Sequence, residues 1–181
     1  TLSKKQNNFC EIRLVDPDDN DVKDGEPGEL VIRGPSLFSG YWGNDEANSD
    51  AFRNGWFHMG DVFMRNPNGL LDFVDRVKYM IKSGGENIYP AEIEKYIMLD
   101  PRIIDVAVVR KPHERWGEVP VAFVTCNTKK IKTEDIIDLC KGRIANYKLP
   151  KEIYFIKNDE MPRSTSGKIQ RHVLEERLSI I

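Results

Sequence analysis

Residues 75–94, DRVKYMIKSGGENIYPAEIE, lie where the sequence pattern of the chain changes. Two glycines, Gly84 and Gly85, stand between short apolar segments, which predicts a tight hairpin turn with positive φ angles. Pro90 suits the first turn of a helix, and Ile93 begins an apolar face that continues one turn later. We therefore expect a hairpin that is followed directly by a helix.

The segment before this junction has the pattern of β structure. Apolar and polar residues alternate over 10–14, and a second strand is expected over 29–33. An Asn-Gly pair at 54–55 and a turn-forming run at 66–69 bracket the segment 56–65, which predicts two linked antiparallel hairpins.

After the junction, strands are expected to alternate with helices. Strands are predicted over 106–109, 121–126 and 153–156. A helix is expected to begin at a Thr133 cap, with apolar positions at every fourth residue: Ile136, Cys140 and Ile144. A last helix has three apolar positions: Ile169, Val173 and Leu178. The fold class is therefore predicted to be α+β, with a mostly β segment followed by a lobe whose short central sheet is flanked by helices.

Length and charge limit the possible functions. The 181 residues suit one medium domain or two small ones. The net charge of −2 excludes the strongly basic composition of many nucleic-acid binders. Residues 1–75 carry 7 basic and 14 acidic side chains, a net of −7, and residues 76–181 carry a net of +5. The basic part could attract an anionic ligand such as a nucleotide phosphate, or its charges could be ordinary solvated surface.

The sequence predicts neither a membrane span nor a metal site. The longest unbroken apolar runs, such as 106–109, have four residues, whereas a membrane-spanning helix needs about 20. A secretory leader is not expected either. The cysteines and histidines lack metal-ligand spacing. The cysteines are expected to be buried thiols in a reducing compartment, which favours the cytoplasm: Cys10, Cys126 and Cys140.

Residues 162–168, PRSTSGK, contain a Gly-Lys pair after small hydroxyl residues, as phosphate-binding loops do. Pro162 replaces the opening glycine, and Ile169 follows the lysine where a magnesium-binding hydroxyl is required, so the phosphate-loop interpretation fails. A flexible loop remains that presents Lys168 just before a helix. Such a lysine can bridge oxyanions, or it can be an ordinary surface residue.

Two further pairs each allow two interpretations. Gly60-Asp61 and Asp75-Arg76 could form strand-end ion pairs, or they could direct a carboxylate and a guanidinium at a ribose and a phosphate. The Gly84–Gly85 pair could serve only the turn, or it could let a thin ligand pass close to the backbone.

Taken in order, three segments resemble the carboxy-terminal motifs of adenylate-forming enzymes: 55–61, 75–94 and 162–171. This superfamily comprises acyl-CoA synthetases, firefly luciferase and peptide-synthetase adenylation domains. Residues 84–90 and 114–118 are most similar to fatty-acyl and aryl-CoA ligases. The resemblance covers nearly the whole chain.

The resemblance implies roles for individual residues in nucleotide chemistry. Asp61 would accept hydrogen bonds from the ribose hydroxyls, and Arg76 would approach the ribose and phosphate. Lys168 would be the catalytic lysine that contacts the carboxylate, the α-phosphate and the bridging oxygen during adenylation. Met59 departs from the usual Thr or Ser before Gly-Asp, which puts the local hydrogen bonding in question.

The resemblance also implies how the lobe would serve a second step. Residues 1–75 would be the end of a large amino-terminal domain, 76–78 a hinge that includes Lys78, and 79–181 a mobile lid. After the lid rotates, the pantetheine of CoA would pass three residues: Gly84, Gly85 and Glu86.

The implied activity is an AMP-forming acid–thiol ligase that uses ATP, Mg²⁺ and CoA to activate a carboxylic acid, most simply a fatty acid. The chain begins without Met and without a pyrophosphate loop, so we expect a carboxy-terminal fragment that is inactive alone. Two other interpretations stay open. The chain could belong to an adenylation domain that loads a carrier protein, or it could be a free-standing nucleotide- or CoA-binding module.

Overall fold

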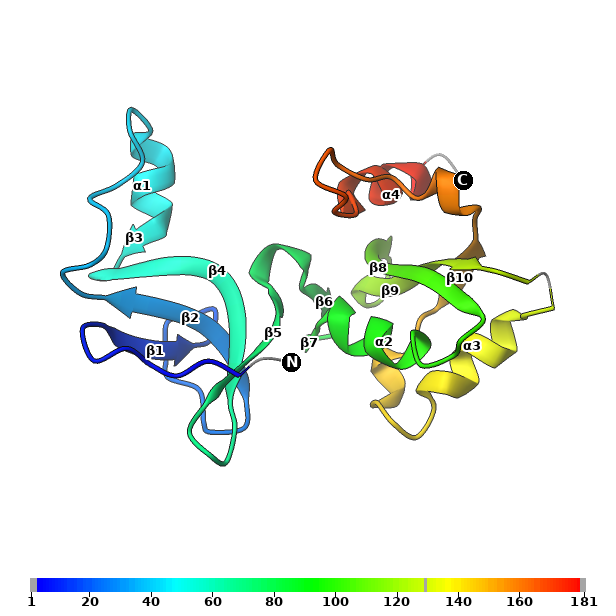
Figure 1. Cartoon of the computed structure of the whole chain (residues 1–181), viewed down its shortest axis with the longest axis horizontal. Helices are drawn as coiled ribbons and strands as arrows, with labels where there is room; N and C mark the ends of the chain where they lie inside the picture. The colour runs from blue at the N-terminus through cyan, green and yellow to red at the C-terminus, as the bar shows by residue number, and fades with distance from the viewer. Residues whose placement is uncertain (1–2, 129, 180–181) are drawn as a thin grey trace. The chain divides into compact units, whose positions relative to one another are not determined.

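The computed structural model describes residues 3–128 and 130–179. The chain forms two compact units, of which the first ends at Lys78 and the second begins at Tyr79 (Figure 1). Each unit has its own apolar core.

The first unit is a curled antiparallel sheet with one short helix. Its elements are β1 (Glu11–Val15), β2 (Pro27–Arg33), α1 (Asp45–Ala51), β3 (Phe52–Arg53), β4 (Trp56–Arg65) and β5 (Leu71–Arg76). The strand order is β1-β2-β4-β3, and β5 pairs with β4. The two predicted hairpins around β4 are confirmed. Helix α1 was not predicted; the Asn44 side chain caps it by accepting from the N–H of Ala47.

The second unit is a sheet with helices on both faces. After the 3₁₀ turn η1 (Val77–Tyr79), its elements are β6 (Ile81–Ser83), β7 (Glu86–Ile88), α2 (Pro90–Ile97), β8 (Ile103–His113), β9 (Gly117–Cys126), α3 (Thr133–Cys140), η2 (Asn146–Lys148), β10 (Glu152–Phe155), η3 (Asn158–Glu160) and α4 (Arg171–Leu178). The strand order is β10-β9-β6-β7, with β8 also paired to β9 and with β10 parallel to β9.

Alternate residues of β8 and β9 point to opposite faces of this sheet and build two separate cores. Val106 and Val108 pack with residues of α2 and α3. Ala107 and Val109 pack with Leu174 of α4. Figure 1 shows α2 and α3 on one side of the sheet and α4 on the other. The α+β prediction, with a short central sheet flanked by helices, is confirmed.

Two details of the predicted helices are wrong. The N-cap of α3 is Lys132 rather than Thr133, and the Asp135 carboxylate accepts the Lys132 N–H at 3.0 Å. Helix α3 also ends at Cys140, because the chain turns at Gly142, whose φ is +71°. Ile144 therefore lies beyond the helix and is still buried. Four-residue spacing predicted the burial of Ile144 correctly, but not its backbone conformation.

Two further positions also differ from expectation. Helix α4 begins at Arg171, so Ile169 precedes it, although its side chain packs against the same core. Of the three cysteines, which are all free thiols, only Cys140 is buried, and Cys10 and Cys126 are half-buried. Burial raises the pKa of the Cys140 thiol to about 11, so this group is a poor nucleophile at neutral pH.

Candidate functional site

Asp61 and Arg76 face each other in the first unit. They are directly opposite in the β4–β5 ladder, and Arg76 Nε lies 2.7 Å from Asp61 Oδ1. The Asp61 side chain is 20% exposed and that of Arg76 is 51% exposed. Among the described residues, Asp61 Oδ1 accepts no aligned hydrogen bond. Arg76 therefore balances the charge of the carboxylate, whose buried Oδ1 keeps capacity to accept a hydrogen bond.

A bulge in β4 brings Asp61 to this place. Val31 of β2 pairs with His58 and Glu29 pairs with Val62, so three residues of β4 lie opposite the single residue Leu30. Gly60 is the middle residue of the bulge, and its φ is +72°, a conformation that favours glycine. Bulges of this kind redirect side chains and are frequent beside functional sites.

Sequence reasoning missed the residues that hold the bulge. The Gly60 N–H donates to Glu29 Oε1 at 3.0 Å. His58, one of the histidines without metal-ligand spacing, is buried, and its Nδ1 lies 3.0 Å from Glu29 Oε2. The amide that follows Met59, the Gly60 N–H, is thus bound by Glu29. The polar residue Glu29 within the apolar strand β2 was the signal that could have identified this cluster.

Lys168 lies in a tightly closed loop of the second unit. The Ser164 N–H donates to the Lys168 carbonyl at 2.8 Å, and the Gly167 N–H donates to the Ser164 carbonyl at 2.8 Å. Arg163 donates to the Gly167 carbonyl at 3.0 Å and pairs with Asp105 of β8. The Lys168 side chain is exposed and makes no ion pair or hydrogen bond within residues 3–128 and 130–179. The loop thus holds the backbone firmly and leaves the ammonium group available.

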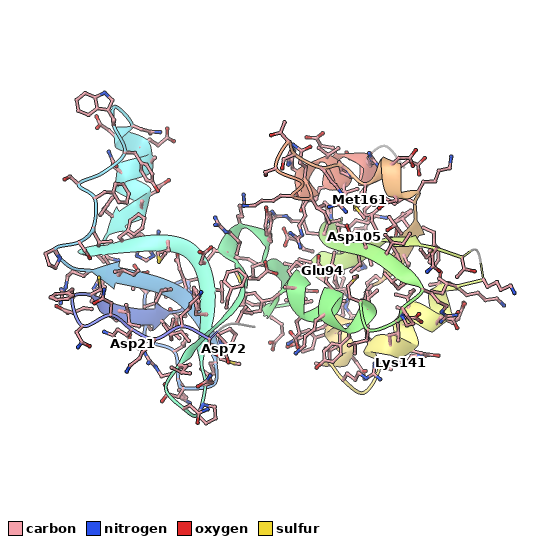
Figure 2. The ribbon with its side chains drawn as sticks, in the orientation of Figure 1. Asp21, Asp72, Glu94, Asp105, Lys141 and Met161 are labelled. Carbon is pink, nitrogen blue, oxygen red and sulfur yellow. The ribbon has the colours of Figure 1, made fainter. Side chains whose placement is uncertain are left out.

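Two ion pairs hold α4, which follows this loop. Arg171 binds both carboxylate oxygens of Glu94 on α2, at 2.6 and 2.9 Å. Glu94, which is labelled in Figure 2, also accepts the Val108 N–H of β8 with its Oε1 at 2.8 Å. One turn later on α4, Glu175 Oε1 lies 3.1 Å from Arg110 Nε of β8.

The predicted glycine turn joins β6 and β7. Gly84 and Gly85 have φ values of +60° and +88°, which confirms the expected positive angles. The Gly84 N–H donates to the Trp116 carbonyl at 2.8 Å. A Cβ on Gly84 would lie 2.8 Å from Cε3 of the Trp116 ring. Glu86 is exposed at the start of β7.

The structure brings some predicted site residues together and leaves others apart in the fold. Asp61 forms a pair with Arg76 in the first unit, and Gly84 to Glu86 share one hairpin in the second. Lys168 lies in a separate loop of that second unit, and Lys78 ends the first unit within η1. Across the described residues, no three His, Cys, Asp or Glu side chains are grouped to hold a metal ion. None of the helices that the structure describes is long and apolar enough to span a bilayer.

Two family models match the chain. Residues 92–168 match the AMP-binding enzyme C-terminal domain, and residues 5–42 match the AMP-binding enzyme family.

The chain is also similar to curated proteins and solved structures that are named as CoA ligases or CoA synthetases. An indoleacetate–CoA ligase of Aromatoleum aromaticum is 44% identical over 90% of this chain and 32% of its own length. A long-chain-fatty-acid–CoA ligase of Mycobacterium tuberculosis is 43% identical over 90% of this chain and 32% of its own length. The structure of o-succinylbenzoate CoA synthetase from Bacillus subtilis, in complex with its acyl-adenylate intermediate, aligns with a TM-score of 0.81 and 34% identity, over 93% of this chain and 34% of that one. The chain thus spans about a third of the length of the curated relatives it matches.

Proposed function

Since the chain belongs to the adenylate-forming (AMP-binding) superfamily and matches the carboxy-terminal part of its members, we propose that it works within a longer ATP-dependent acid–thiol ligase. In the proposed reaction, a carboxylic acid attacks the α-phosphate of ATP, and the thiol of CoA then displaces AMP from the acyl-adenylate. We propose a fatty or aryl acid as substrate, because the two ligases above are named for indoleacetate and long-chain fatty acids.

The observation that carries this proposal is the available ammonium group of Lys168 on a closed loop. Adenylation brings two anions together, the carboxylate and the phosphate. A cation placed where negative charge accumulates stabilises the transition state more than the separate substrates. Because Arg163 and Ser164 fix the loop backbone, the lysine loses less freedom when it engages the reacting oxygens.

The remaining site residues have proposed roles in binding and in the exchange between steps. Asp61 accepts hydrogen bonds from the ribose hydroxyls, and Arg76 neutralises Asp61 and approaches the phosphate. Lys78 acts as the hinge about which residues 79–181 rotate before the second step. Gly84 and Gly85 lack side chains and let pantetheine pass beside Glu86.

Several properties of the whole protein are also proposals. We propose Mg²⁺ as the ion that accompanies ATP, since it commonly binds nucleotide phosphates. We place the protein in the cytoplasm, where thiols such as the three free cysteines of this chain stay reduced. The 181 residues alone are proposed to be inactive, because the relatives are about three times as long.

The test is to separate the two half-reactions in the longer ligase. Lys168→Ala should slow adenylation by about 10² to 10³-fold, the usual loss for one electrostatic contact with a transition state. Thioester formation from preformed acyl-adenylate should change little. Lys141→Ala serves as a matched control, since Lys141 is an exposed lysine paired only with Asp138 of α3 in the described structure. Equal losses in both half-reactions would contradict the role of Lys168. Acyl-adenylate formation by the isolated 181 residues would contradict their proposed inactivity.

A further inference from the structure

Glu29 binds the middle residue of the bulge that presents Asp61, and its side chain also contacts His58, which precedes the bulge, and Arg53 of β3. We propose that Glu29 is a positioning residue, which fixes the Asp61 carboxylate for hydrogen bonding to the ribose of ATP. This inference rests on the proposed function and adds to it a residue that does not itself touch the nucleotide.

The first step of the argument is the backbone of the bulge. Met59, Gly60 and Asp61 stand opposite Leu30 alone, so Gly60 lies outside the β2–β4 ladder. Its N–H donates to Glu29 Oε1 at 3.0 Å instead. An amide that left the ladder without a new partner would favour a return to regular pairing. The bulge offsets the register of β4 by two residues, so regular pairing from Val31 and His58 onward would move Asp61 along the strand to a place opposite Gly28. The contact from Glu29 thus helps to determine where Asp61 lies.

The second step is that Glu29 is itself held in place. Its other carboxylate oxygen, Oε2, lies 3.0 Å from His58 Nδ1 and 3.2 Å from an Arg53 nitrogen. The Glu29 side chain is 12% exposed and that of His58 is 4% exposed. A side chain with three partners and little contact with water is confined to a single conformation.

A second carboxylate completes the cluster on the far side of these partners. Asp19 Oδ1 lies 3.7 Å from His58 Nε2, and Asp19 Oδ2 lies 3.8 Å from Arg53 Nε. The side chain of Asn54 also donates to Asp19. His58 and Arg53 are therefore each held from two sides, so the support of the bulge extends from the β3–β4 turn to the loop after β1.

The third step concerns residue 59. Because the Gly60 amide is bound by a carboxylate from the neighbouring strand, the bulge needs no hydroxyl at position 59. Met59 is then compatible with a working site, and its side chain is exposed.

The experiment compares how efficiently each variant uses two nucleotides, one with and one without the ribose 2′-hydroxyl. In the longer ligase, kcat/KM for adenylation is measured with ATP and with 2′-deoxy-ATP, and their ratio reports the contact between Asp61 and the ribose. A variant that is merely less stable loses activity with both nucleotides equally, so the ratio is insensitive to the folded fraction. Glu29→Ala should lower the preference for ATP by about tenfold, the worth of one hydrogen bond to a charged group.

Three further variants make the test specific. Glu29→Asp keeps the charge but is too short to reach the Gly60 amide, so it should lower the preference as well. Glu29→Gln keeps an oxygen at the same distance and should retain most of the preference. Glu11→Ala removes a carboxylate from an exposed ion pair with Arg33 on the same sheet, and it should leave both the rate and the ratio unchanged.

The outcomes separate this inference from the proposed function. If the unmodified ligase forms no acyl-adenylate, or if Asp61→Ala leaves the preference for ATP intact, the proposed function fails and this inference fails with it. If Asp61→Ala removes the preference while Glu29→Ala and Glu29→Asp both retain it, only the positioning role of Glu29 is overturned.

Discussion

Single residues determine the shape of the loops that carry the proposed chemistry. Gly60 and Gly84 both adopt a positive φ, but for different reasons. A side chain at position 60 would meet no atom within 4 Å, so only the backbone conformation requires glycine there. A side chain at position 84 would also collide with the Trp116 ring, 2.8 Å away. Gly84 therefore has two physical constraints and Gly60 has one.

This difference predicts unequal effects of two neighbouring substitutions. Gly84→Ala and Gly85→Ala both place alanine at a positive φ, which costs about 1 kcal/mol of stability or more. Gly84→Ala should cost about 1 kcal/mol beyond that, because the Trp116 ring must move. Denaturant unfolding of the second unit measures both losses. The additional loss of stability in Gly84→Ala should disappear in a Trp116→Ala background. Equal losses of stability for Gly84→Ala and Gly85→Ala would contradict the proposed collision with the Trp116 ring.

At the scale of elements, ion pairs fasten helix α4 at its first residue and one turn later. Arg171 binds Glu94 of α2 near the first turn, and Glu175 binds Arg110 of β8 one turn later. Glu94 in turn accepts the Val108 amide of β8. Since α4 follows the Lys168 loop directly, these pairs set where that loop leaves the body of the second unit.

The pair between Arg171 and Glu94 should contribute measurably to stability. Both side chains are 16% exposed, so removal of one partner leaves a charge with little water around it. Glu94→Gln should lower the free energy of unfolding of the second unit by about 3 kcal/mol. Asp138→Asn, which breaks the exposed pair with Lys141, should cost less than about 0.5 kcal/mol. Thermal or denaturant unfolding measures both variants. If Glu94→Gln and Asp138→Asn lower the free energy of unfolding by similar amounts, burial of the Arg171–Glu94 pair does not add to its contribution to stability.

At the scale of the whole molecule, the chain passes from a net acidic unit to a net basic unit. The division between Lys78 and Tyr79 lies within η1. Residues 1–78 carry 9 basic and 14 acidic side chains, a net of −5, and residues 79–181 carry 18 and 15, a net of +3. A basic unit attracts anions such as the phosphates of ATP and CoA. Asp61 and Arg76 belong to the first unit, and Lys168 and Gly84 belong to the second. The proposed two-step reaction therefore requires the backbone near Lys78 to change its dihedral angles.

Proline at this position should affect the two steps differently. Lys78→Pro holds φ near −65° and should impair thioester formation in the longer ligase, with adenylation largely retained. Lys78→Ala leaves φ free and should support both steps. Single-turnover measurements with ATP and acid, and then with preformed acyl-adenylate and CoA, distinguish these outcomes. Unchanged CoA-dependent turnover in the proline variant would rule out a hinge at Lys78.

The sequence by itself determined the local elements and the candidate chemistry. Two-residue alternation placed the strands, Asn-Gly and Gly-Gly placed the turns, and Pro90 marked the start of α2, because each of these signals acts between near neighbours in the chain. The resemblance to known motifs selected Asp61, Arg76 and Lys168 as candidates.

Only the tertiary structure decided how those residues are held. Glu29 meets Gly60 across 31 positions of the sequence, and Arg171 meets Glu94 across 77. Local periodicity contains no information about such partners, since they come together only when strands pair and helices pack on the sheet. For the same reason the four-residue spacing extended α3 to Ile144 incorrectly: burial of Ile144 depends on the core it reaches, and the end of the helix depends on the turn at Gly142.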